Sequence, residues 1–369
     1  MKGAVTTTSA AMDRAGALRL VADNAALLDT AGQSNPYLLS AWTEHFLRQI
    51  AADDWRIHAP RAADGSLMLL YGTAEAPRRL HSLVNYYSSL WAPALADPAQ
   101  AAGAVDEIVD QLTRLRPRPA SLQLSPLSAE HPSTAALVSA LQARGWFVSR
   151  YFCFGNWYMD CEGLSFDTYM SQRESRLVNT WKRKAKKLAG GPGAPTRVEI
   201  ITTPEQVDAA VAAYESIYAK SWKQPEPYPN FVGDWARTCA RQGWLRMGLA
   251  WVDGVPVAAQ LWFTVARRAY IFKLAYDEAY ASWSAGTVLS AELFRHSLDV
   301  DHVVEIDYLT GDDAYKRSWM SQRRERVGLL ACNLRTAAGV MLAGREWLGA
   351  LRKRSRAAEP VVATQPAET

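Results

Sequence analysis

One segment in the last third of the chain carries side chains suited to acid–base chemistry. Within residues 311–316, Asp312 and Lys316 are four positions apart, so they would share one face of a helix. A carboxylate can orient or deprotonate a nucleophile, an ammonium can stabilise an oxyanion, and a phenol such as Tyr315 can protonate a leaving group. We therefore take Lys316, Asp312 and Tyr315 as candidate catalytic residues. The alternative is an ordinary ion pair on a helix surface.

A second pattern is suited to binding an anion. A strand expected to end near Tyr276 is followed by a loop of small residues and by a helix that opens at Thr287, with Gly286 at the junction. The first amides of a helix have no intrahelical partner and carry the positive end of its dipole, so this junction could bind a pyrophosphate. The alternative is a tight turn with a structural cap. The residues predicted to bind a cofactor are Tyr276, Ser284, Gly286 and Thr287.

Aromatic residues form a third pattern. The 369 residues include 14 Trp and 15 Tyr, and their amphipathic rings suit the half-buried walls of a cleft as well as a core. We expect Trp222, Trp283 and Asp307 to line a substrate cleft. A place in the core is the alternative for the two tryptophans.

Composition limits the class of protein. Apolar residues make up 49% and charged residues 21% of the chain, which is typical of globular proteins, and the length favours two domains. The net charge of +4 is small and mostly dispersed, so nucleic acid is not an expected partner. Four scattered cysteines show no spacing of a zinc site or a disulfide framework, so no metal is expected.

No apolar run reaches the roughly 18 residues needed to span a bilayer, and the N-terminus lacks the apolar core of a signal peptide. We expect a cytoplasmic protein without a transmembrane segment.

The elements that must position these residues form two mixed α/β modules. A strand over residues 18–21 is expected before the first module. In that module, a helix begins near Ser40 and is followed by a hairpin over residues 55–71. In the second, an antiparallel meander over residues 245–275, with a turn at Asp253-Gly254, leads to a helix over 285–298 and to a final strand over 326–332. The predicted divisions are a lead-in (1–34), an N-terminal module (35–163), a basic helical connection (164–193), a C-terminal module with the donor site (194–333), a basic helix (334–356) and a disordered tail (357–369).

These segments resemble the GNAT superfamily of acyltransferases, and more closely its CelD-like subfamily, which is related to the FemAB aminoacyltransferases. The resemblance covers most of residues 35–333. It rests on Asn35-Pro36-Tyr37 with Trp42, the basic run 183–188, the hairpin 251–259, and the run 276–316 with Tyr276-Asp277, residues 284–289 and residues 307–316.

The resemblance implies two tandem GNAT-like modules of mostly antiparallel sheet flanked by helices, which face each other across a cleft with a thioester or ester donor in the second. It also implies that Lys316 steadies the transferred carbonyl and that Tyr315 protonates the leaving thiolate. The chain departs from the family in its donor loop, where Gly286 is the only glycine between Leu274 and Leu289.

We therefore expect an enzyme, an N-acyltransferase that moves an acyl group from acetyl-CoA or another acyl-CoA directly to an amine of a sugar, amino acid or related metabolite, in envelope polysaccharide biosynthesis as the resemblance suggests. One alternative is a Fem-like transferase that uses aminoacyl-tRNA. The other is a non-catalytic binding subunit of a polysaccharide assembly complex. The sequence does not predict the oligomeric state.

Three further patterns have a plainer explanation. His296 and Asp301 match the spacing used by glycerophosphate acyltransferases, but no phosphate-binding motif of that family accompanies them. The basic helix over residues 173–187 could hold donor phosphates or form a solvated face. The C-terminal helix over residues 334–356 could lie on an anionic membrane or pack on its own domain.

Overall fold

The structure is a computed structural model that describes residues 11–358, with side chains described through residue 349. The first ten residues of the predicted lead-in lie outside this range. The predicted tail also lies outside it, except for residues 357 and 358, which end helix α12 (Ala337–Ala358).

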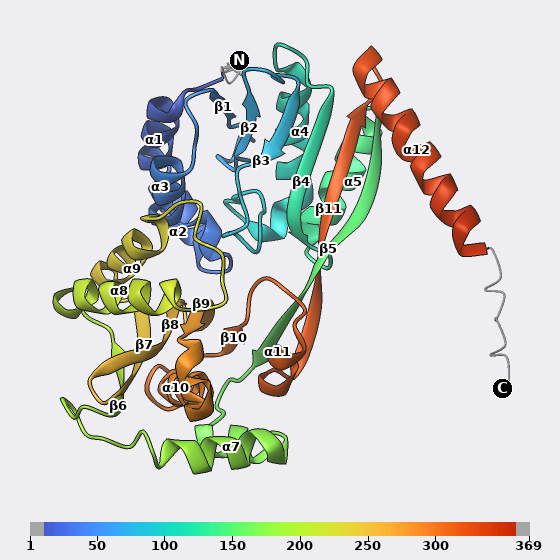
Figure 1. Cartoon of the computed structure of the whole chain (residues 1–369). Helices are drawn as coiled ribbons and strands as arrows, with labels where there is room; N and C mark the ends of the chain where they lie inside the picture. Colours follow the sequence, from blue (N-terminus) through green and yellow to red (C-terminus); the bar gives the residue numbers. More distant parts are fainter. Residues whose placement is uncertain (1–10, 359–369) are drawn as a thin grey trace, which may run out of the picture.

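One continuous sheet of eleven strands organises the described residues (Figure 1). Its spatial order is β1-β2-β3-β4-β11-β5-β10-β9-β8-β7-β6, and only the pairs β3–β4 and β9–β10 are parallel. The strands are β1 (Trp55–His58), β2 (Leu70–Thr73), β3 (Arg79–Ser82), β4 (Ser121–Ser128), β5 (Trp146–Asp160), β6 (Arg197–Ile201), β7 (Leu245–Val252), β8 (Val255–Val265), β9 (Arg268–Tyr276), β10 (Glu305–Asp307) and β11 (Gln322–Asn333). The predicted mixed, mostly antiparallel α/β fold is confirmed.

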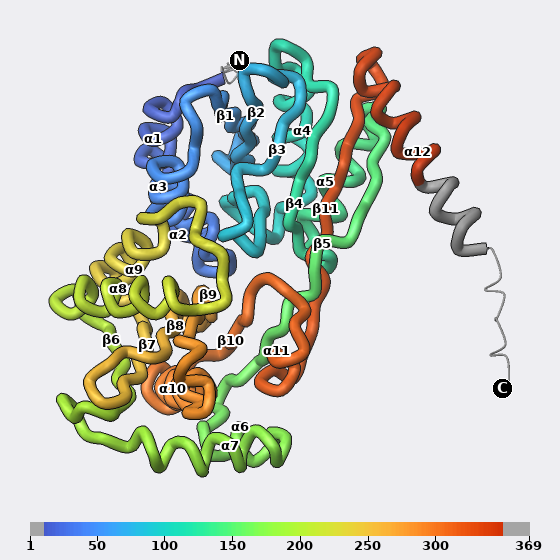
Figure 2. The backbone as a smooth tube through the Cα atoms, viewed as in Figure 1, coloured from blue at the N-terminus to red at the C-terminus, as the bar shows by residue number. Residues whose placement is uncertain are grey.

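Two long strands carry the sheet from the first half of the chain into the second. β5 and β11 pair antiparallel from Tyr158↔Gln322 to Trp146↔Asn333. β11 also pairs with β4, and the C-terminal end of β5 pairs with β10. Figure 2 traces the two strands side by side through the centre of the molecule. The two predicted sheets are therefore joined by backbone hydrogen bonds, and the predicted domain boundaries stay a prediction.

Helices cover both faces of this sheet. Besides α12 they are α1 (Arg14–Asp23), α2 (Ala25–Gly32), α3 (Ser40–Gln49), α4 (Ala101–Arg114), α5 (Pro132–Ala143), α6 (Phe166–Ser171), α7 (Ser175–Ala185), α8 (Pro204–Ala219), α9 (Phe231–Arg241), α10 (Ala285–Arg295) and α11 (Ala314–Trp319). The predicted connection between the modules thus contains two helices, α6 and α7. Among residues 11–358, no helix combines the length and the apolar character needed to span a bilayer.

The N-terminal helices belong to a core that both halves share. Trp42 of α3 is 1% exposed and makes edge contacts with Trp235 and Phe231 of α9, at centroid distances of 4.8 and 5.6 Å. Such aromatic pairs add to the free energy of apolar burial. The first-half helices are thereby fixed against the second half, which positions both walls of the site described next.

Local signals explain why one predicted element was wrong and another right. Residues 18–21 were expected to form a strand, but they lie in α1, where the Asp13 side chain accepts a hydrogen bond from the Gly16 amide as an N-cap. Ala17 and Val21 are buried one helical turn apart. The predicted turn at Asp253-Gly254 is confirmed, because both residues have positive φ values and join β7 to β8.

Candidate active site

A gap between two strands creates the site. β9 pairs with β10 only through Arg268–Tyr270 and Glu305–Asp307. β9 then continues to Tyr276, whereas the chain after Asp307 turns away through residues 308–310 toward α11. The backbone of β9 past Tyr270 therefore has no partner strand on this side, and the wedge between the diverging segments is open to a ligand.

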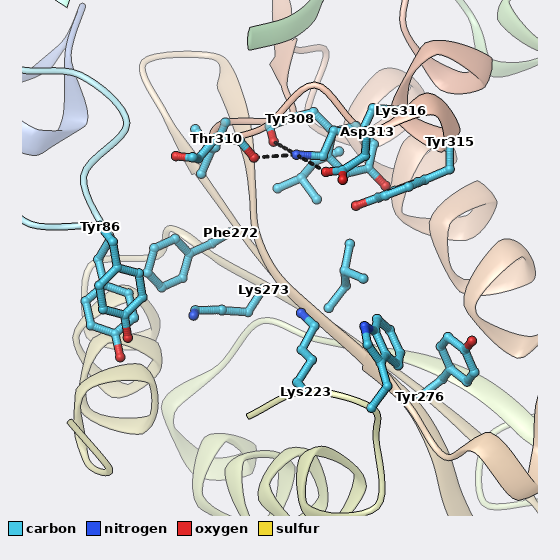
Figure 3. Close-up of a pocket in the computed structure, with 15 residues that line it drawn as sticks. Tyr86, Lys223, Phe272, Lys273, Tyr276, Tyr308, Thr310, Asp313, Tyr315 and Lys316 are labelled. Carbon is cyan, nitrogen blue, oxygen red and sulfur yellow. Dashed lines mark hydrogen bonds and ion pairs between the residues drawn. The ribbon is translucent and has the colours of Figure 1, made fainter. Parts of the chain in front are cut away.

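A cavity of 640 Å³, called here the lysine cavity, occupies this wedge (Figure 3). Its walls include Tyr86 and Trp222 together with Tyr276 of β9. Lys223, Lys273 and Lys316 also line it. Figure 3 shows the ammonium groups of Lys223 and Lys273 on one side of the cavity and that of Lys316 on the other.

Lys316 is held by the loop that follows β10. The residue is 4% exposed, and its Nζ donates to the carbonyl oxygens of Thr310 at 2.5 Å and Tyr308 at 3.3 Å. Its third neighbour is Asp313 Oδ2 at 3.5 Å. Burial lowers the pKa of Lys316 from its ordinary value, and Asp313 partly opposes that shift. The ammonium group thus has three oxygen neighbours, of which Asp313 is the most distant.

Lys273 forms part of a polar cluster with Glu226. Glu226 accepts hydrogen bonds from Lys273 Nζ at 2.5 Å, Tyr87 Oη at 2.6 Å and Tyr86 Oη at 2.7 Å. Burial alone would raise the pKa of Glu226, but these donors outweigh it and keep the pKa below its ordinary value. Glu226 is therefore a carboxylate that neutralises Lys273.

Lys223 lacks such a partner. No carboxylate lies within 4.0 Å of its ammonium group among the described residues. Its Nζ instead lies 5.6 Å from the centre of the Trp222 ring and 5.9 Å from that of Tyr218. Burial, followed by the charge of Lys273, lowers the pKa of Lys223 to about 8. With Lys316 beside Asp313 and Lys273 beside Glu226, Lys223 leaves the cavity with one uncompensated positive charge.

A second cavity of 520 Å³, called here the α10 cavity, meets the first. Both are lined by Leu274, Tyr276, Tyr308 and Tyr315. Gly286 and Thr287 of α10 line only the second, as does Arg176 of α7. A ligand in the α10 cavity therefore reaches the lysine cavity past these shared side chains.

The N-terminus of α10 can accept an anion there. Ser284 is in the left-handed conformation and makes no side-chain cap, and its carbonyl accepts from the Thr287 and Val288 amides. The amides of Ala285 and Gly286 have no acceptor among the described residues. No atom lies within 4 Å of where a Cβ on Gly286 would be. Free amides at a helix N-terminus whose Gly286 lines a cavity are suited to a phosphate group.

The structure brings together only part of the predicted set. Tyr276, Tyr315, Lys316 and Trp222 line the lysine cavity, and Gly286 and Thr287 line the α10 cavity with Tyr276 and Tyr315. Tyr315 is 47% exposed, and burial raises its pKa to about 12. The other four predicted residues, which line neither cavity, are Ser284, Trp283, Asp307 and Asp312.

The predicted helix face shared by Asp312 and Lys316 is wrong. α11 begins at Ala314, so Asp312 lies before the helix. Its carboxylate accepts from Arg323 at 2.7 Å and from Trp157 Nε1 at 2.7 Å, and Arg323 lowers its pKa. The carboxylate beside Lys316 is that of Asp313.

Asp307 and Trp283 also lie outside the lysine cavity and the α10 cavity. Asp307 is 3% exposed and accepts from Asn156 Nδ2 at 2.6 Å and Arg324 Nη2 at 2.5 Å. Trp283 packs against the core beneath α10, with Lys187 Nζ 5.9 Å from its ring centre. The predicted substrate cleft therefore retains Trp222 alone of its three residues.

The sequence reasoning missed Lys223, Lys273, Glu226 and the pair Tyr86-Tyr87. One signal was available for Glu226. It is the only acidic residue in a loop with Pro225, Pro227 and Pro229, and the fixed φ of proline restricts such a loop. No local pattern marks Lys273, which lies in an otherwise ordinary strand. No group of three or more His, Cys, Asp and Glu side chains in the described part of the chain could hold a metal ion.

Part of the chain matches a known protein family, and its fold is similar to those of several solved structures. Residues 175–317 match the family model described as acetyltransferase (GNAT) domain. No curated protein matches the chain significantly. Among solved structures, FemX is 11% identical over 83% of this chain and 95% of its own, with a TM-score of 0.57.

Two more structures show the same fold. The C-terminal domain (DUF2156) of a proposed lysylphosphatidylglycerol synthetase from Agrobacterium fabrum is 11% identical over 87% of this chain and 95% of its own, with a TM-score of 0.52. L-PGS from Bacillus licheniformis is 10% identical over 88% of this chain and 96% of its own, with a TM-score of 0.51. At this identity the similarities concern the fold alone. Residues 175–317 are therefore a GNAT domain, and the chain that carries it is an acyltransferase.

Proposed function

We propose that the protein is an N-acyltransferase that moves an acyl group from acyl-CoA directly to an amine of a sugar, amino acid or related metabolite. The observation that carries this proposal is the meeting of the two cavities at Tyr276, Tyr308 and Tyr315. One cavity ends at a helix N-terminus suited to phosphates, and the other is lined by lysines. A donor and an acceptor could thus approach each other from opposite sides of the shared wall.

The donor is assigned to the α10 cavity. Its pyrophosphate would accept from the free amides of Ala285 and Gly286, and the Arg176 guanidinium at the same cavity adds positive charge. The acyl end would then extend past Tyr276 into the wedge. Its thioester carbonyl would lie near Lys316, where it could replace Asp313 as the third acceptor of the ammonium and be stabilised as it gains charge.

The acceptor is assigned to the lysine cavity. An amine must be neutral to attack, so a base must take its proton. The pKa of Lys223, about 8, lets a fraction of that side chain accept the proton near neutral pH. The amine nitrogen bonds to the carbonyl carbon, the carbon–sulfur bond breaks, and Tyr315, protonated below about pH 12, can protonate the leaving thiolate.

A Fem-like reaction is the second candidate, because one observation favours it. The basic helix α7, whose Arg176 lines the α10 cavity, also carries Lys182, Arg183 and Lys184 in its last turn. The names of two structural neighbours, FemX and a lysylphosphatidylglycerol synthetase, are those of Fem and lysyl-lipid proteins. An aminoacyl-tRNA, like CoA, presents phosphates to such a surface.

The cellular setting remains part of the proposal. We place the protein in the cytoplasm, where acyl-CoA is available, with a role in envelope polysaccharide synthesis and with peripheral membrane contact through α12. Val340, Met341, Trp347 and Leu348 of that helix are each more than half exposed. Exposed apolar residues on one helix are suited to a membrane surface.

Thermal unfolding with free CoA, acetyl-CoA and longer acyl-CoAs tests the donor. A ligand that binds only the folded state raises the unfolding temperature. Gly286→Asp, which places a carboxylate at the proposed phosphate site, should abolish that rise. Gly344→Asp is the matched control, because Gly344 also has no atom within 4 Å of a Cβ but lies in α12. No rise with any CoA compound in the wild-type protein would favour the aminoacyl-tRNA or the non-catalytic alternative.

A further inference from the structure

A third cavity lies apart from both parts of the candidate active site. It has a polar compartment of 180 Å³ and an apolar compartment of 110 Å³. Ser34, Leu90, Ser128 and His131 line both compartments, so the two adjoin. None of these residues lines the lysine cavity or the α10 cavity. The polar compartment is bounded by the turn before α3 and by the central strands β9, β10 and β11.

The polar compartment has an excess of positive charge. Arg268, Arg324 and Arg326 face two carboxylates, Glu305 and Asp307. Arg324 Nη2 lies 2.7 Å from Glu305 Oε1 and 2.5 Å from Asp307 Oδ2, so it binds both. Arg268 is 3.9 Å from Glu305, and Arg326 is 4.0 Å from Asp307. Three guanidinium groups against two carboxylates leave one positive charge without a counterion.

Arg326 is the residue whose hydrogen bonds are incomplete. Its side chain is 4% exposed, and its Nη2 donates to Asn156 Oδ1 at 3.0 Å. Its Nε has no hydrogen-bond partner. A buried donor on a charged group without a partner is costly, and Arg326 is one of the residues that line the polar compartment.

The hydroxyl groups of Ser89 and Tyr37 are neutral hydrogen-bond donors in the same compartment as Arg326. Ser89 Oγ donates to Tyr37 Oη at 3.2 Å, and both residues line the polar compartment. Burial raises the pKa of Tyr37, so its phenol stays protonated and can donate its own hydrogen. A ligand acceptor could therefore receive hydrogen bonds from Arg326 and Tyr37 together.

The second compartment is more apolar than the first. Its apolar lining residues include Leu38, Leu90, Trp91, Pro93 and Leu95, and its polar ones include Asn35, Ser133 and Thr134. Its volume of 110 Å³ leaves room for a few methylene groups and excludes a long chain. A molecule that fills both compartments must therefore be small, with one polar end and one apolar end.

We propose that this cavity binds a small monocarboxylic acid, with its carboxylate at Arg326 and Tyr37 and its short apolar tail against Trp91. A carboxylate supplies the one negative charge that the polar compartment lacks. Inorganic phosphate would bring more charge than is uncompensated, and it has no group for the apolar compartment. The site is separate from acyl transfer, so it does not depend on the proposed function.

Isothermal titration of the full-length protein tests this site with hexanoate, its uncharged analogue hexanamide, and inorganic phosphate. Arg326→Gln removes the charge at the carboxylate end. Ser34→Trp fills the exposed mouth that both compartments share and leaves the charged network intact. Arg150→Gln is the matched control, because it makes the same change at an exposed position on the neighbouring strand β5.

We expect hexanoate to bind the wild-type and Arg150→Gln proteins, with binding at least tenfold weaker to Arg326→Gln and to Ser34→Trp. Hexanamide and phosphate should not bind measurably at the same concentration. If Arg326→Gln does not fold, Ser34→Trp decides the question. Equal binding of hexanoate and hexanamide, binding of phosphate as strong as that of hexanoate, no binding of hexanoate to the wild type, or unchanged binding by Ser34→Trp would each overturn the proposal.

Discussion

Replacing Lys223 with methionine should make the protein more stable at pH 7. The Lys223 ammonium is largely buried without a carboxylate partner, and its pKa falls from 10.5 to about 8 on folding. The unfolded chain therefore binds more protons between these values, so the penalty is fully present below pH 8, fades between pH 8 and 10.5, and is absent at higher pH. At about 1.4 kcal/mol per pH unit, this gives at most about 3.5 kcal/mol. Partial exposure of the side chain lowers our expectation to about 1–3 kcal/mol.

Urea unfolding of the wild-type and Lys223→Met proteins at pH 7 and pH 10 measures this difference. The gain should fall below about 1 kcal/mol at pH 10, where most of the penalty has gone. Lys220→Met is the control, because Lys220 is half exposed and lies 3.9 Å from Asp277. A neutral or destabilising effect at pH 7 would refute the reasoning. A gain that is equal at both pH values would refute it too, since it would reflect packing rather than charge.

Three further predictions concern the same half of the molecule. Lys316→Met should lower kcat about 10²- to 10³-fold, the usual effect of losing one oxyanion donor. The control variant Arg317→Gln, on the exposed side of α11, should keep the wild-type kcat. Similar rates for both variants in a CoA-release assay would contradict the role of Lys316. Glu226→Gln should lower the free energy of unfolding by about 3 kcal/mol or more, because it leaves the buried ammonium group of Lys273 unpaired. Glu215→Gln, at an exposed position, is the control. Equal urea midpoints for the two variants would argue against the pairing of Glu226 with Lys273. Trp347→Ser should reduce co-sedimentation with phosphatidylserine vesicles relative to phosphatidylcholine vesicles, and unchanged sedimentation would count against membrane contact through α12.

Much of the local structure could be predicted from the sequence. The Asp253-Gly254 turn and the helix after Tyr276 follow from short-range signals, because turn geometry and helix periodicity depend on neighbouring residues. α1 was taken for a strand because its apolar residues are clustered, and the Asp13 cap was overlooked. β3 was missed because Leu80 is its only apolar residue, so it lacks the alternation that indicates a strand.

The site was harder to predict because its parts come from distant segments. Tyr86, Lys223, Lys273 and Lys316 meet only after the first half of the chain packs on the second. Asp312 was preferred to Asp313 because the pairing argument treated residue 312 as helical, whereas α11 begins at Ala314. Outside the helix, a separation of four residues does not bring two side chains to one face. Spacing along the chain indicates a pair only when the element boundary is known.

The position of β11 in the middle of the sheet also bears on biosynthesis. Because the ribosome delivers the N-terminus first, β4 and β5, which end at Ser128 and Asp160, emerge long before β11, which begins at Gln322 and separates them. Until β11 arrives, both nascent strands present open edges, which are templates for aggregation. The N-terminal half therefore cannot complete its sheet co-translationally, and a chain that stops before residue 322 should be a substrate for chaperones rather than a folded fragment.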